Sequence, residues 1–152
     1  SGFFFVLVYF IGMKQLDFHN ISDEDLHRFA CRCVEQFIPS SLFNELGQRA
    51  LALKKRWLED SGRKQELDEL IGEVTSLLAN NDETICSRLI LETILALLDK
   101  DPLTCAKATA NKVIVTIGQY AYEKEGWRDA TDAQGSIFRW QKEQLEELRK
   151  LD

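Results

Sequence analysis

The chain has 152 residues, of which 45% are hydrophobic and 29% charged, and its formal net charge is −6. A chain of this length is expected to form one domain that buries a core without disulfides or a structural metal. The negative charge argues against nucleic acid and anionic membranes as partners, because both favour a basic surface. It suits a basic protein partner, although the same charge also serves solubility.

The first thirteen residues carry no charge, and Phe3–Ile11 is an unbroken apolar run. The run is too short to cross a membrane, which takes about 20 residues, and it lacks the positive segment of a signal peptide. Met13-Lys14 begins a sequence of ordinary composition. We therefore expect residues 1–12 to be a non-native apolar extension and residues 13–152 to be a single helical domain. An apolar run of this kind also invites self-association through Phe3–Ile11.

Periodic apolar residues after Lys14 predict six helices joined by short turns. The first follows Ser22, which can cap it, and ends before Pro39, because the residue before a proline avoids the helical region. The second begins at Ser40 or Ser41, with Glu45 placed to complete a capping box, and ends near residues 60–62. Its basic run, residues 54–56, lies near the helix end, where cations suit the dipole. The third covers about residues 67–78.

The fourth helix, about residues 83–99 with Asp82 as its cap, is apolar nearly all round, which predicts a central position. The fifth starts at Asp101-Pro102 and runs to about Lys124, with a strand at residues 113–115 as the alternative. Gly126 is expected to end it, and the sixth helix spans about residues 128–150. Together the patterns predict an all-α fold of about six antiparallel helices, in a bundle or a short α-solenoid-like array.

The cysteines offer little chemistry. His27 and Cys31 are four residues apart, on a helix face that lies off the apolar stripe, and two ligands are too few for a metal site. Cys31 and Cys33 point about 200° apart on a helix, so they cannot share a metal or a disulfide. Cys86 and Cys105 lie near helix starts, where a thiol pKa can fall, but we expect small, semi-buried side chains there. We predict reduced thiols in a cytoplasmic protein and no bound metal.

An enzyme would have to use His19 or His27, because the sequence has two histidines. The sequence contains no Gly-x-Ser-x-Gly elbow, no His-Glu-x-x-His pair and no glycine-rich phosphate loop. Its paired carboxylates lie at helix ends, where capping explains them. We therefore predict no enzyme and no cofactor, and a small hydrolase that uses these histidines is the last alternative.

Two segments resemble a known family. Residues 30–39 read Ala-Cys-Arg-Cys-Val-Glu-Gln-Phe-Ile-Pro, and residues 137–141 read Ile-Phe-Arg-Trp-Gln, followed by Gln144-Leu145. These segments resemble the first and the closing helix of immunity proteins from bacterial polymorphic toxin systems. The resemblance implies a role in binding and neutralising a toxin made by the same bacterium or its kin. Many such toxins are basic nucleases. A helical scaffold or adaptor with another protein partner is the alternative.

The residues that would bind a partner are acidic and aromatic. If the first and third helices lie side by side, their acids and those of the following turn form one acidic field. Exposed tryptophans are common anchors of interfaces, although packing between helices is the competing role for Trp140. The candidate partner-binding residues are Asp23, Glu24, Glu66, Asp68, Glu69, Glu73, Asp82, Glu83, Trp127 and Trp140.

Overall fold

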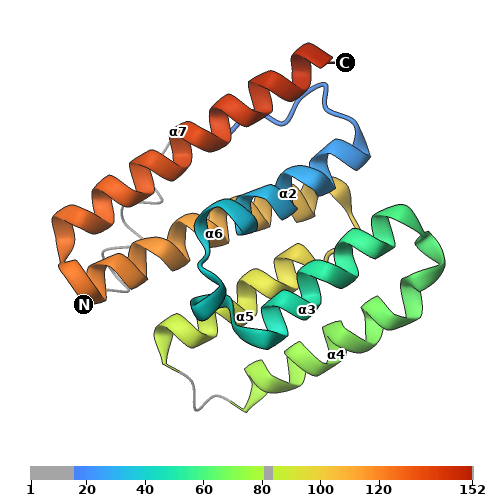
Figure 1. Ribbon diagram of the computed structural model, residues 1–152, viewed down its shortest axis with the longest axis horizontal. Coiled ribbons are helices and arrows are strands. Elements are labelled where there is room, and N and C mark those ends of the chain that lie inside the picture. Colours follow the sequence, from blue (N-terminus) through green and yellow to red (C-terminus); the bar gives the residue numbers. More distant parts are fainter. Residues whose placement is uncertain (1–15, 81–83, 152) are drawn as a thin grey trace.

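The computed structural model describes residues 16–80 and 84–151, and this part of the chain is helical and contains no strand (Figure 1). The predicted all-α fold is therefore confirmed. The apolar run Phe3–Ile11 and the acids Asp82 and Glu83 lie outside the described residues. A short 3₁₀ turn, Ser61–Arg63, precedes α4. The helices are α2 (Asp23–Phe37), α3 (Ser40–Glu59), α4 (Lys64–Ala79), α5 (Ile85–Leu97), α6 (Pro102–Glu125) and α7 (Trp127–Leu151).

Local side-chain chemistry sets most helix ends. The Ser22 hydroxyl accepts a hydrogen bond from the Asp25 N–H at 3.2 Å, and the Asp101 carboxylate accepts one from the Thr104 N–H at 2.9 Å. Both caps confirm the sequence predictions. Thr84, which the sequence did not single out, caps α5 in the same way. Residues 113–115 are helical, so the strand alternative is wrong.

The start of α3 differs from the prediction. Neither Ser40 nor Ser41 caps this helix; Pro39 precedes it and offers no side-chain cap. Asn44 interrupts the first turn with φ 63° and ψ −175°, and its Oδ1 accepts a hydrogen bond from the Gly47 N–H at 3.2 Å. The Phe43 ring folds back onto Gly47, where an added Cβ would lie 2.5 Å from the ring. Asn44 therefore caps the long part of α3, because this short amide tolerates positive φ.

The helices pack around α6. Helices α2, α5 and α7 all pack extensively on α6, whereas α4 lies at the edge of the molecule against α3 and α5 (Figure 1). The contact of α2 with α6 joins elements far apart in sequence, while solenoid units contact only their neighbours. The fold is therefore a bundle. Helix α5 lies inside, as predicted, but the helix at the centre is α6, whose small buried residues include Ala106 and Ala110.

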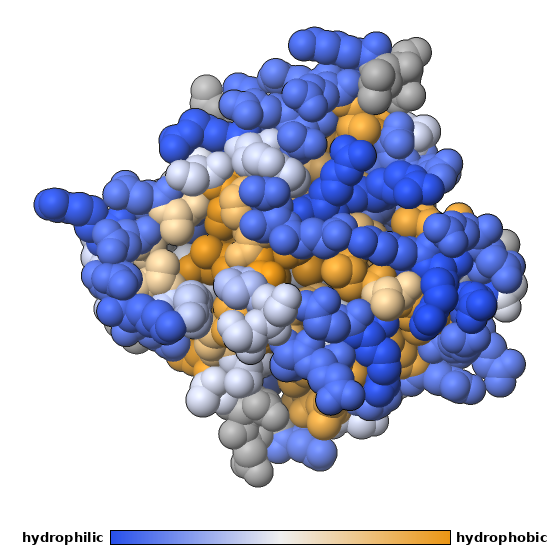
Figure 2. Space-filling view, in the orientation of Figure 1, coloured by the Kyte–Doolittle hydropathy of each residue, from blue (hydrophilic) through white to orange (hydrophobic). Residues whose placement is uncertain are grey.

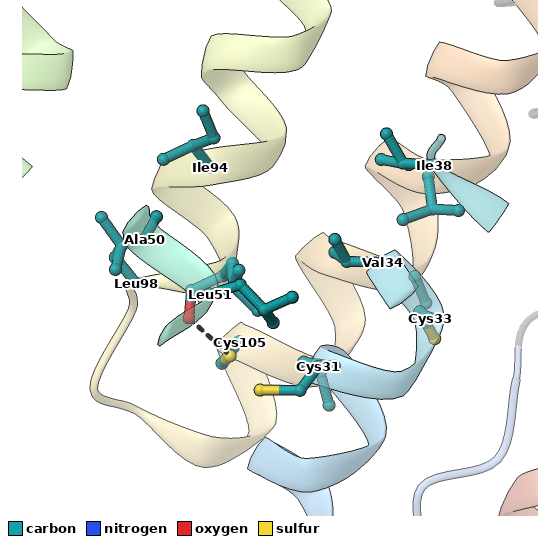
Figure 3. Packing of buried hydrophobic residues seen from close by; sticks show 14 of the residues in the cluster. Cys31, Cys33, Val34, Ile38, Ala50, Leu51, Ile94, Leu98 and Cys105 are labelled. Atoms are coloured by element: carbon teal, nitrogen blue, oxygen red, sulfur yellow. Dashed lines mark hydrogen bonds between the residues drawn. The ribbon is translucent and has the colours of Figure 1, made fainter. Parts of the chain in front are cut away.

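One continuous core joins these helices. Figure 3 shows side chains from α2, α3, α5 and α6 meeting in it, and it places the sulfur atoms of Cys31 and Cys33 on different sides of α2. Figure 2 shows hydrophobic residues along the middle of one face, with hydrophilic residues covering its periphery. Among the described helices, none has the length and apolar character needed to cross a membrane.

Candidate protein-binding surface

The outer face of α4 carries four of the acids that the sequence predicted for partner binding. Leu67, Leu70 and Val74 bury one side of α4 against α3 and α5. The helical period of 3.6 residues therefore turns the opposite side to solvent, and the residues along that line are all exposed. We call this line the α4 crest, and it consists of Gln65, Glu69, Gly72 and Ser76.

Acids on both flanks of the α4 crest form ion pairs. About half of each acidic side chain remains exposed, so these pairs add little stability. On the crest, Glu69 accepts a hydrogen bond from the Gln65 amide at 3.4 Å. The flanking pairs are Glu73 with Arg49, Asp68 with Lys100, and Glu66 with Arg63.

A shallow groove of about 230 Å³ runs between α3 and α4 beside the crest. Leu53 and Leu70 form its apolar part, and charges of both signs surround them. Both leucines are almost fully buried, so a partner that follows the crest would meet carboxylates first and a groove of mixed charge beside them. The charged residues of the groove are Arg49, Arg56, Glu66, Glu69 and Glu73.

The acids of α2 do not join this surface. Asp23 and Glu24 lie in the first turn of α2, where Glu24 pairs with Arg28 at 2.7 Å. Helix α3 lies between α2 and α4, so the condition for a single acidic field is not met (Figure 1). The physical reason is that α2 buries its main apolar face against α6.

The two tryptophans have different environments. Trp140 is partly buried, and its ring meets the Phe37 ring edge-on with centroids 5.1 Å apart. This contact favours the role of Trp140 in packing between helices. Trp127 begins α7 and is 58% exposed, at the corner where α6 meets α7. That corner lies far from α4 (Figure 1), so Trp127 and the α4 crest are separate surfaces.

Lys54, in the basic run near the end of α3, lies in the core. Its side chain is fully buried, whereas the other two residues of the run, Lys55 and Arg56, are exposed. The Lys54 ammonium donates to the Asp99 carbonyl at 2.7 Å and to Cys105 Sγ at 3.6 Å, and it lies 4.7 Å from the centre of the Trp57 ring. Burial lowers the pKa of Lys54. Because Asp99 follows α5, the cation lies at the C-terminal end of that helix, where the dipole favours it.

His27 and Cys31 lie beside this lysine and are buried, with 4% and 3% exposure. The prediction that their face lies off the buried stripe is wrong, because α2 packs against both α6 and α3 and so buries a wide arc. The His27 ring meets the Trp57 ring edge-on at 5.1 Å. Burial and the nearby Lys54 lower the pKa of His27 to about 4, and burial raises that of Cys31 to about 12.

These shifts keep the imidazole and thiol neutral, so they act as packing groups. Burial also raises the pKa of Cys86 and of Cys105, against the direction expected for thiols at helix starts. His19 is exposed in the segment before α2, while His27 faces the core. In the part of the chain that the structure describes, no three His, Cys, Asp or Glu residues are grouped as a metal site.

In comparisons with protein family models, curated proteins and solved structures, nothing matches this chain. The chemistry of the α4 crest therefore follows from its own residues.

Proposed function

We propose that this chain is a protein-binding module of the immunity type, which neutralises a cognate bacterial toxin by binding it in the cytoplasm. The resemblance of residues 30–39 and 137–145 to immunity proteins supports this role. The α4 crest is the observation that carries the proposal, because it combines an exposed carboxylate, Glu69, with an adjacent shallow groove lined mostly by charged side chains. A basic toxin domain complements such a surface.

The other surface residues support the same class of function. Glu66, Asp68 and Glu73 lie on the same helix as Glu69, each in an ion pair with a basic side chain. Their ion pairs leave them about half exposed, so a basic partner can compete for them. Trp127 is exposed at a separate corner, where α6 meets α7.

The test is calorimetric titration of this protein with the toxin domain encoded by the neighbouring gene. We expect binding that weakens as salt rises, because the complementary charges are exposed and screened. Glu69→Lys should weaken binding about tenfold at low salt, since it places a like charge against the basic partner.

Glu143→Lys is the matched control, because Glu143 is an exposed glutamate within α7, at the far edge of the molecule. It makes the same change of net charge and should leave the affinity within about twofold of the wild type. Equal losses in both variants would mean that only the overall charge matters. A gene neighbourhood of metabolic enzymes, without a toxin domain, would contradict the immunity role.

A further inference from the structure

A single residue connects α6 to α7. Gly126 separates Glu125 from Trp127, whereas antiparallel helices are usually joined by about 2–8 residues. Gly126 has φ 92° and ψ −170°, a conformation that other residues essentially never adopt. Its N–H donates to the Tyr122 carbonyl at 3.0 Å, and its carbonyl accepts from the Ala130 N–H at 3.2 Å. Gly126 therefore already makes the hydrogen bonds of a helical residue to the residues four positions before and after it. Helical φ and ψ at Gly126 would make residues 102–151 one continuous helix.

Among the described residues, the side chains on both sides of Gly126 are exposed to solvent. The side chains at 123–125 and 127–129 are all exposed, and the first buried side chain of α7 is that of Ala130. A Cβ added at Gly126 would have no atom of the described chain within 4 Å. A change of backbone conformation here would therefore disturb no packed side chain around the turn itself.

The α6–α7 interface contains two buried glutamines beside its apolar contacts. The buried Gln134 amide donates to the Ile114 carbonyl at 3.2 Å, opposite Gly118. Farther along, the buried Gln141 amide donates to the Ala110 carbonyl at 3.1 Å. Neither glutamine Oε1 has a hydrogen-bond partner among the described residues. The two bonds to α6 carbonyls fix one register for an α7 helix that lies there, whether it belongs to the same copy or to another.

From these observations we infer that α7 is exchanged between two copies of this chain. In the exchanged dimer, Gly126 becomes helical, and the α7 of each copy packs on the α6 and α2 of the other copy. The buried contacts of α7 are the same in the monomer and in the exchanged dimer. The conformation of the connection therefore sets the equilibrium between the two forms. A connection this short favours exchange, since opening it replaces a tight turn with helix.

Substitution of Gly126 tests this inference. Gly126→Ala resists a φ of 92° and favours the helical conformation, so the dimer fraction should rise at least tenfold at equal concentration. Insertion of Gly-Ser-Gly after Gly126 should instead lower the dimer fraction below that of the wild type. The proteins are equilibrated near the midpoint of urea unfolding, dialysed, and measured by size-exclusion chromatography with light scattering. A folded Gly126→Ala protein without more dimer than the wild type overturns the inference.

A second variant keeps the test decisive if Gly126→Ala does not fold. Gln141 Nε2 lies 3.8 Å from Cys33 Sγ, so Gln141→Cys places a thiol of α7 beside a thiol of α2. Copies with and without ¹⁵N label are mixed, equilibrated at high concentration and oxidised, and the linked peptides of the dimer fraction are weighed. Cys33 joined to residue 141 of a differently labelled copy supports exchange. Links only within one label, or no dimer, overturn it.

Discussion

Lys54 connects α3 to the end of α5 through a buried charge. Burying an ammonium is unfavourable unless all of its donors find acceptors, and here a carbonyl, a sulfur atom and an aromatic face surround it. Its aliphatic stem also fills part of the core. The Asp99 carbonyl, just beyond the last turn of α5, gains a charged donor that the helix itself does not supply.

Lys54→Ala is expected to lower the free energy of unfolding by about 3 kcal/mol, because it leaves a cavity and removes the donor to Asp99. Lys55→Ala is the matched control. Lys55 is exposed and pairs with Glu35 at 2.9 Å on the surface, so its loss should change the stability by less than about 1 kcal/mol. Urea denaturation of both variants checks the difference. Similar losses would show that the buried ammonium contributes no more than the exposed one.

His27 makes the stability depend on acid. Its pKa is about 4 in the folded protein against 6.5 for the exposed group, so the unfolded chain takes up a proton first as the pH falls. The resulting stability is fully present above pH 6.5 and is lost between pH 6.5 and 4. We expect a loss of about 2 kcal/mol at pH 5 and about 3 kcal/mol at pH 4 from this residue alone.

Urea denaturation at pH 7, 5 and 4 measures this loss, and His27→Leu serves as the reference. The variant lacks the titrating group, so its stability should fall less than that of the wild type over the same range. Parallel pH profiles of the two proteins would mean that His27 titrates in the folded protein as it does in the unfolded chain.

At the scale of helices, two glycines in helix interiors should respond oppositely to the same substitution. A Cβ at Gly118 would lie 2.2 Å from the Gln134 amide nitrogen, so Gly118→Ala should cost about 1–3 kcal/mol. Gly72 on the α4 crest has open space, so Gly72→Ala should stabilise the protein by about 0.5–1 kcal/mol. Thermal unfolding of both variants checks the signs. A further Gln134→Ala substitution should recover part of the Gly118→Ala loss, and no recovery would place the strain elsewhere.

The helices that the sequence predicted well are those with local signals at their ends. Ser22, Asp101 and Gly126 act within one turn of the chain, so the local sequence alone reveals the helix ends that they form. The break at Asn44 depends on how Phe43 folds onto Gly47, and the burial of Lys54 depends on Asp99 and Cys105. A period of three and four residues does link Phe43, Gly47, Ala50 and Lys54. Lys54 is also the first of three consecutive basic residues, and this run hides its place on the buried stripe.

At the scale of the molecule, the sequence could not place helices relative to one another. The amphipathic stripes show that each helix has a partner, but they do not say which one. The acids of α2 and α4 form one field only if these helices are neighbours, and α3 lies between them. The α4 crest depends on the edge position of α4, which follows from the packing of α3 and α5.

The same packing makes a prediction for the apolar start of the chain. The buried stripes of α2 through α7 already contact one another in one cluster, so the described helices supply each other with buried surface. A protein that begins at Met13 should therefore keep the helical circular-dichroism signal and unfold cooperatively within about 2 °C of the full chain. It should also lose any association that Phe3–Ile11 causes, which light scattering would detect. Loss of cooperative unfolding would mean instead that Phe3–Ile11 forms part of the core.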